Sequence, residues 1–152
     1  MTNLILDTNI IKWLSSPYSN EKSVKASEIF QSICDGKHDG ILIPPVIMET
    51  YYKLSESDDE PYAKAFINTL LSMPNLYVVV LTREIGMYAG ELYFKYNTTP
   101  KIANPTFNAP GAVDCLLAAT NNFVDNSIVC TGDGHFRRMT EITSDFFGIS
   151  TI

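Results

Sequence analysis

Short apolar runs alternate along this chain with longer stretches of helical spacing, and no other feature of the sequence constrains the fold as strongly. The runs are rich in β-branched residues and occupy Leu4–Leu6, Ile41–Ile43, Tyr77–Leu81 and Ser127–Cys130. Strands that alternate with helices are typical of a parallel sheet covered by helices. We therefore expect an α/β fold with a central parallel sheet.

The stretches between the runs predict helices over residues 10–14, 23–34, 44–54, 61–71, 82–96 and 109–123. In the second of these, Ala26, Ile29, Phe30 and Ile33 share one helical face. Two segments are predicted to be irregular. Ser55–Glu60 is an acidic, polar run that we interpret as a solvated connection. Asn97–Pro110 holds three prolines and three asparagines, and we expect a long loop there.

Length and composition limit the class of protein. A chain of 152 residues that is 45% hydrophobic and 18% charged is predicted to form one domain over residues 1–152. No apolar run approaches the roughly 20 residues of a membrane span. The three cysteines form no CxxC pair and the start lacks a signal-peptide pattern, which predicts a cytoplasmic protein with no membrane partner.

Four acidic residues occupy positions where the pattern calls for a turn or an apolar side chain. Asp7 and Asp133 each follow an apolar run, where open α/β sheets bind their ligands. Glu49 and Asp114 lie in the first turns of predicted helices, on faces shared with apolar residues. Each acid taken alone also has a structural explanation: a helix cap, a turn, an ion pair with Lys53 for Glu49, or a dipole contact for Asp114.

Taken together, the four acids predict a metal site. Carboxylates that converge without countercharge repel and raise each other's pKa. Mg²⁺ or Mn²⁺ resolves this repulsion, because these cations prefer oxygen ligands and are commonly held by a few carboxylates together with a substrate phosphate. Such a site fits metal-assisted hydrolysis of a phosphodiester.

At these residues the sequence resembles the PIN-domain ribonucleases, whose commonest prokaryotic members are VapC-type toxins. The resemblance rests on four ordered motifs: Leu4-Ile-Leu-Asp-Thr-Asn-Ile10, Pro44-Pro-Val-Ile-Met-Glu49, Asp114-Cys-Leu-Leu-Ala-Ala-Thr120, and Val129-Cys-Thr-Gly-Asp133 with Phe136. It implies a three-layer α/β/α sandwich with a central parallel sheet. It also implies an endoribonuclease that depends on Mg²⁺ or Mn²⁺, a homodimer, and an antitoxin protein as partner.

Carried over by position, the resemblance makes Asp7, Glu49, Asp114 and Asp133 the catalytic, metal-binding set. Asn9 and Thr131 match the supporting polar positions. Lys12, Arg137 and Arg138 are candidate phosphate contacts, with solvated surface charge as the alternative. We interpret Trp13 as a core or dimer-contact residue, with stacking of an unpaired RNA base as the alternative.

Two other functions compete with the ribonuclease. A haloacid-dehalogenase-like phosphatase also places an Asp after its first strand, but it needs a second acid where this chain has Asn9. The other alternative is a catalytically inactive PIN fold that binds protein.

The net charge of −6 argues against a nucleic-acid partner at first sight. Four acids belong to the predicted site, however, and four more to the run Glu56–Glu60. Without these eight, nine acids face 11 bases, a balance of +2. We therefore expect weak nonspecific RNA affinity that depends on metal more than on a basic surface.

Overall fold

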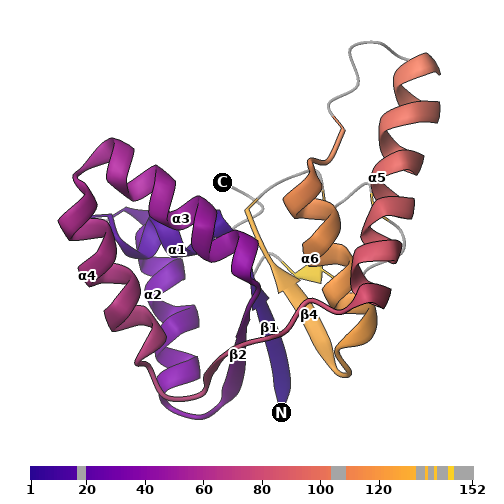
Figure 1. The fold of residues 1–152 in the computed structure, drawn as a ribbon. Coiled ribbons are helices and arrows are strands. Elements are labelled where there is room, and N and C mark those ends of the chain that lie inside the picture. The colour runs from indigo at the N-terminus through magenta and orange to yellow at the C-terminus, as the bar shows by residue number, and fades with distance from the viewer. Residues whose placement is uncertain (17–19, 104–108, 133–135, 137–138, 140–143, 146–152) are drawn as a thin grey trace.

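The sheet has five parallel strands in the order β3-β2-β1-β4-β5 (Figure 1). The computed structural model describes residues 1–16, 20–103, 109–132, 136, 139 and 144–145. The strands are β1 (Thr2–Leu6), β2 (His38–Leu42), β3 (Leu76–Val78), β4 (Ser127–Cys130) and β5 (Ser144–Asp145). Because β1 is central and pairs with β2 on one side and β4 on the other, it is the strand best shielded from solvent.

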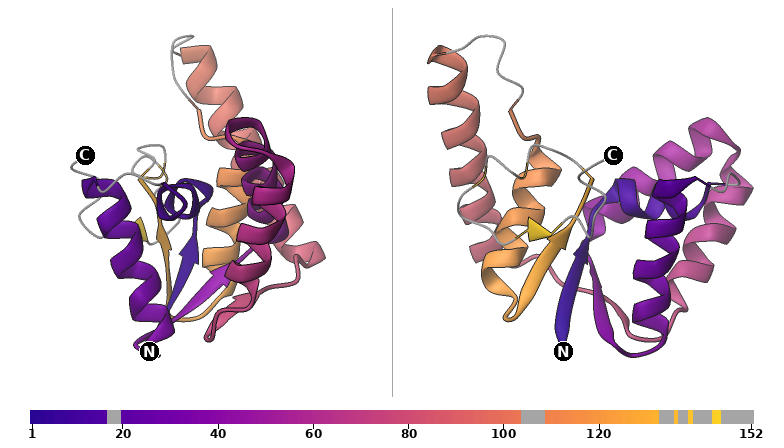
Figure 2. Two further views of the ribbon diagram at one scale, coloured as in Figure 1. Left: turned by 90° about the vertical axis from the view of Figure 1, so that its left-hand side faces the viewer. Right: turned by 180° about the vertical axis from the view of Figure 1, so that it is seen from behind.

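Six helices connect the strands. They are α1 (Thr8–Leu14), α2 (Glu21–Cys34), α3 (Pro44–Ser57), α4 (Glu60–Leu71), α5 (Arg83–Ala103) and α6 (Ala112–Phe123). Helices α1 to α4 gather on the side of β2 and β3, whereas α5 and α6 lie together on the side of β4 (Figure 1). Figure 2 shows helices on both faces of the sheet, which confirms the predicted three-layer α/β/α sandwich.

The core forms between the sheet and the helices. Leu4, Ile5 and Leu6 of β1 are fully buried, as expected for a strand covered on both faces. The four apolar residues predicted to share one face of α2 are all buried as well. Asn20 caps this helix in a reciprocal arrangement with Ser23, and the helix ends before Gly36, whose φ of 73° favours glycine.

The segment Ser55–Glu60 was predicted to be a solvated connection: its residues from Glu56 onward are exposed, but the extent of the connection was wrong at both ends. Helix α3 continues to Ser57 and α4 begins at Glu60, so only Asp58 and Asp59 separate the two helices. Asp59 caps α4 by accepting a hydrogen bond from the Tyr62 backbone N–H at 2.7 Å. Asp59 and Glu60 therefore start α4 rather than extend a loop, because Asp and Glu are favourable at a helix N-terminus.

The predicted loop over Asn97–Pro110 was wrong for its first half, because α5 runs on to Ala103. Packing holds the part of α5 that precedes this extension, where Ile85, Ala89, Leu92 and Tyr96 form a buried stripe. The Asn97 side-chain amide then donates to the carbonyls of Tyr93 and Pro110, at 3.0 and 3.1 Å, and ties the helix to the segment that leads into α6.

Smaller differences concern the strands. The run Tyr77–Leu81 was predicted as a strand, but β3 covers only Leu76–Val78, and β5 was not predicted. The short β3 is an edge strand with a single neighbour, β2, so less pairing holds it in the sheet. Among the helices that the structure describes, none has the length and apolar character needed to cross a membrane.

Candidate active site

Three elements bring acidic residues to the carboxyl edge of the sheet. Strand β1 ends at Leu6 and is followed at once by Asp7. Helix α3, which carries Glu49, begins directly beyond β2, and α6, which carries Asp114, begins on the same side of the sheet as the end of β1 (Figure 1). This common edge follows from the parallel strands, whose carboxyl ends all point the same way.

Asp7 is the most buried of these acids, with 5% of its surface exposed. It caps α1, because its Oδ1 accepts a hydrogen bond from the Thr8 backbone N–H at 2.7 Å. Its Oδ2 accepts a second hydrogen bond, also 2.7 Å long, from the hydroxyl of Thr131. The cap that was the structural alternative for Asp7 is therefore present, and the same carboxylate also bonds to the end of β4. A buried carboxylate held by fixed donors is well oriented.

Thr8 connects Asp7 to Glu49. Its side-chain hydroxyl donates to Glu49 Oε1 at 2.6 Å, while its backbone N–H holds Asp7. Thr8 is 1% exposed, so water does not compete for these bonds. Thr8 thus holds the carboxylate of its neighbour Asp7 and that of Glu49, which lies 41 positions further along the chain. The alternative partner for Glu49, Lys53, forms no ion pair with it among the residues described.

Sequence reasoning identified Thr131 as a supporting residue, and its bond to Asp7 is consistent with that role. It missed Thr8. The available signal was position: a hydroxyl residue directly after the first strand's acid opens a short helix, and its side chain faces α3. Recognising it required the packing of α1 against α3, which no local pattern reveals.

Asp114 lies at the start of α6, as predicted, and is partly exposed. Its Oδ2 accepts a hydrogen bond from the Gly111 backbone N–H at 3.0 Å, which closes the first turn of the helix. The structural alternative for Asp114, stabilisation of a helix N-terminus, is therefore present. Within the described ranges, no group of three or more His, Cys, Asp or Glu side chains is arranged to hold a metal ion.

Three sequence-predicted positions lie outside the described residues: Asp133, Arg137 and Arg138. Their roles stay predictions. Asn9 and Lys12 are described, and they line a hollow of about 500 Å³ between α1 and the end of α3. Asn9 is the residue after Thr8 in α1, and its supporting role stays a prediction.

The donor chemistry of the described site suits a hard divalent cation. Asp7 and Glu49 supply carboxylate oxygens on one connected run of hydrogen bonds, and Thr8 and Thr131 orient them. A carboxylate oxygen that accepts one hydrogen bond can also coordinate a metal. The residues that would hold Mg²⁺ or Mn²⁺ are therefore Asp7 and Glu49, and the contribution of Asp114 and Asp133 stays a prediction.

Cys115 follows Asp114 but is not suited to metal binding or nucleophilic attack. Burial, and secondarily the charge of Asp114, raise the pKa of its thiol to about 11. The thiolate is the reactive and metal-binding form, and it is scarce at neutral pH when the pKa is this high. Cys115 is thus a buried apolar residue, as its sequence context predicts.

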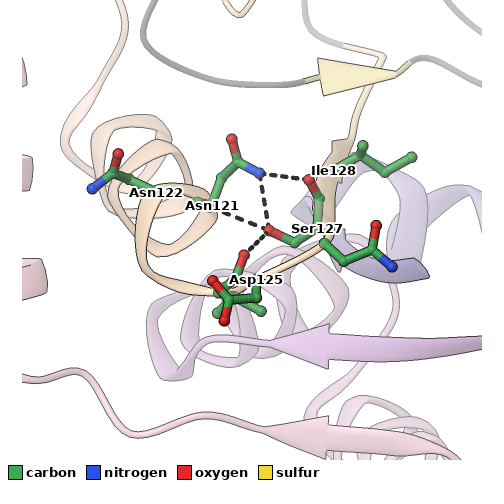
Figure 3. A pocket seen from close by; sticks show the side chains of 7 residues that line it. Asn121, Asn122, Asp125, Ser127 and Ile128 are labelled. Atoms are coloured by element: carbon green, nitrogen blue, oxygen red, sulfur yellow. Dashed lines mark hydrogen bonds between the residues drawn. The ribbon is translucent and has the colours of Figure 1, made fainter. Parts of the chain in front are cut away.

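A second hollow, of about 460 Å³, lies at the opposite edge of the sheet, around the turn from α6 to β4 (Figure 3). The side-chain amides that line this hollow make hydrogen bonds that hold the turn in place. Asn121 Nδ2 donates to the backbone carbonyl and the hydroxyl of Ser127, at 2.9 and 3.0 Å. The Asn126 side chain donates to the Met1 carbonyl, and the φ of Asn126 is 48°. This hollow therefore belongs to a hydrogen-bonded turn at the edge of the sheet opposite Asp7.

The fold is an α/β sandwich with acidic residues at the carboxyl edge of its sheet, and comparison with known families identifies the class. The family model for the PIN domain matches residues 4–142, so the chain belongs to the PIN-domain family. This membership decides against the haloacid-dehalogenase-like alternative. A comparison with curated proteins finds no match.

Solved structures with the same fold include complexes of VapC-type proteins. VapBC2 from Rickettsia felis, bound to a DNA fragment from its promoter, has a TM-score of 0.68 at 17% identity, covering 95% of this chain and 98% of that one. VapBC-1 from nontypeable Haemophilus influenzae has a TM-score of 0.67 at 19% identity, with 96% and 98% covered. VapC20 from Mycobacterium tuberculosis, a toxin that cleaves the sarcin-ricin loop, has 0.66 at 16%, with 90% and 95% covered. At these identities the likeness concerns the fold.

Proposed function

We propose that this chain is a metal-dependent endoribonuclease that acts as the toxin of a toxin–antitoxin pair. The observation that carries the proposal is the hydrogen-bonded run from Thr131 through Asp7 and Thr8 to Glu49 at the carboxyl edge of the sheet. PIN-domain proteins are generally hydrolytic nucleases, and this run supplies the oriented carboxylates that such chemistry needs.

In this proposal the residues of the site bind the metal and orient the carboxylates that hold it. Asp7 and Glu49 hold Mg²⁺ or Mn²⁺, which supplies Lewis acidity that lowers the pKa of water and offsets the charge of the phosphate. Thr131 and the Thr8 backbone fix both oxygens of Asp7. Burial of Asp7 keeps this carboxylate from turning into solvent. Asp114 and Asp133 complete the acidic set in the proposal.

The toxin assignment rests on the family and on similar structures. Two of the structures of like fold are VapBC complexes bound to DNA, from Rickettsia felis and Salmonella typhimurium. We infer that this chain likewise has an antitoxin partner, that it forms a homodimer and that it acts in the cytoplasm. The neighbouring genes test this role. A small reading frame that encodes a basic DNA-binding protein would support the toxin, and the absence of such a frame would favour a housekeeping nuclease.

The first prediction concerns cleavage itself. Purified protein should cut single-stranded RNA in the presence of Mg²⁺ or Mn²⁺ and lose this activity in excess chelator. Asp7→Asn should reduce the rate by at least about 100-fold, because it removes a charge that helps hold the cation. Asp114→Asn tests the contribution of α6. Cleavage rates from a labelled RNA measure all three, and activity that survives chelation, or that neither variant diminishes, contradicts the proposal.

A calorimetric titration with Mn²⁺ separates the nuclease from the inactive PIN-fold alternative. A nuclease should bind Mn²⁺, and Asp7→Asn should weaken that binding. Failure of the wild-type protein to bind a divalent metal favours a protein-binding module. Asp125→Asn is a matched control, because Asp125 lies at the α6–β4 turn on the opposite edge of the sheet.

A further inference from the structure

The hollow between α1 and the end of α3 is formed by the two helices that carry Thr8 and Glu49, but it has no role in the candidate active site so far. It is lined by residues of both helices and of the α3–α4 connection, among them Asn9, Lys12, Trp13, Leu54, Ser57 and Asp58. Its volume of about 500 Å³ lies within the range of small-ligand sites. Asn9 is the residue after Thr8, so the lining of the hollow starts one residue beyond the one that bonds to Asp7 and Glu49.

We propose that this hollow binds one base of the RNA substrate, stacked on Trp13, with Lys12 contacting a phosphate next to that base. The inference rests on the proposed function. Lys12 and Trp13 lie about one helical turn after Thr8 in α1, so a strand with one phosphate beside Asp7 and Glu49 can reach the hollow with a neighbouring nucleotide. Unpaired bases are bound in proteins by stacking on aromatic rings beside a cationic groove, and the lining supplies both elements.

Trp13 is partly buried and packs against the core, so the protein already holds its ring in place. The ammonium of Lys22 lies over this ring, 5.2 Å from its centre. An exposed cation–π contact shifts an equilibrium by only about two- to fivefold, whereas stacking of a base shifts it by about five- to 150-fold. A base that stacks on the ring face under Lys22 can therefore displace the ammonium from it.

The polar lining suits the edge of a base. The Asn9 side chain carries both donors and an acceptor, and the Asp58 carboxylate accepts hydrogen bonds. Leu54, 1% exposed, forms part of the floor. A cationic peptide is the competing occupant, because Asp58 belongs to an acidic run. Lys12 and Lys22 flank Trp13, however, and would repel such a peptide while attracting a phosphate.

The chain offers a direct probe, because Trp13 is its single tryptophan. Hexanucleotides of A, of C and of U are titrated, up to millimolar concentration, into the wild-type protein in excess chelator. Under these conditions the proposed cleavage is silent, and only the part of the RNA affinity that needs no metal is measured. We expect binding to quench the tryptophan emission. An unchanged emission overturns the proposal, whether anisotropy of a labelled hexanucleotide reports binding elsewhere on the protein or no binding at all. Quenching by hexa-arginine and not by RNA overturns it too, and assigns the hollow to a protein partner.

Variants test the same point without relying on fluorescence. Trp13→Leu should raise the dissociation constant about five- to 150-fold, and Trp13→Phe should restore part of the loss. Lys12→Ala should lower the slope of log affinity against log salt by about 0.7. Lys12 is exposed, so this variant does not disturb the core. Lys37→Ala is the matched control, because Lys37 is exposed and precedes β2 at the opposite edge of the sheet.

The two hypotheses fail in different ways. If metal-dependent cleavage occurs but Trp13 stays silent and Lys12→Ala keeps the salt slope of the wild type, the base-binding hollow is wrong and the nuclease stands. If no cleavage occurs while RNA still quenches Trp13, the nuclease is wrong and the hollow is an RNA-binding site without that chemistry.

Discussion

Thr8 shows how much of the site depends on one short side chain. Its hydroxyl and its backbone N–H together bridge Glu49 and Asp7, with bonds of 2.6 and 2.7 Å. A hydrogen bond to a charged group contributes more to stability than one between neutral groups. At a metal site, residues that orient the ligands also tune affinity for the metal. Thr8 is thus a positioning residue of the proposed nuclease.

A substitution at this residue separates positioning from folding. Thr8→Val keeps the shape of the side chain and the backbone bond to Asp7, but it releases Glu49. We expect Mn²⁺ affinity, measured by calorimetry, and the cleavage rate to fall about 10- to 100-fold. Thr8→Ser, which restores a hydroxyl, should recover most of both. Equal losses in the two variants would indicate that Thr8 acts through packing alone.

At the scale of elements, β2 and α5 show opposite uses of glycine. Gly40 in β2 lies under the neighbouring strand and helix: a Cβ there would come within 2.6 Å of Leu76 Cδ1 and 2.9 Å of Ile33 Cδ1. Gly90 lies inside α5, and a Cβ there would meet nothing within 4 Å. The first glycine allows close packing of β2, whereas the second only lowers the helical tendency of α5.

Substituting alanine at these two glycines should change the free energy of unfolding in opposite directions. Gly40→Ala should lower the free energy of unfolding by about 1–3 kcal/mol, because the flexible ends of Leu76 and Ile33 must shift. Gly90→Ala should raise it by up to about 1 kcal/mol, because alanine favours the helix. Urea denaturation measures both, and each variant is the control for the other. A stabilised Gly40→Ala would show that the packing around β2 is looser than the structure indicates.

At the scale of the whole molecule, acidic and basic residues are concentrated in separate regions. The net charge is −6, yet Asp7 and Glu49 lie in the candidate site, and Asp58 and Asp59 lie in the α3–α4 connection. Lys12 lines the hollow between α1 and the end of α3, and Lys22 lies over the ring of Trp13. Among the described residues, these two lysines are the cations that we assign to a phosphate backbone, while Arg137 and Arg138 stay predicted contacts. We therefore expect attraction between protein and RNA to depend on a small number of contacts.

This arrangement predicts a shallow salt dependence. Each phosphate contact with a single strand contributes about 0.7 to the slope of log affinity against log salt, so two contacts lose less than about tenfold between 50 and 200 mM salt. The KM for RNA cleavage, measured at these two salt concentrations with Mg²⁺ held constant, should change by no more than that. A protein with an extended basic surface would lose about 10³- to 10⁵-fold, and a change of that size would contradict the expectation.

The sequence alone determined the fold class, because its alternating apolar runs and helical stretches are local patterns that a parallel sheet requires. It also placed Asp7 and Glu49 at one edge, because the carboxyl ends of parallel strands meet there. Only the tertiary structure decided that Thr8 joins these two acids, that α5 continues past Asn97, and that Asn9 and Trp13 border one hollow. These features depend on which helices pack together, and the side chains that decide them are far apart in the chain.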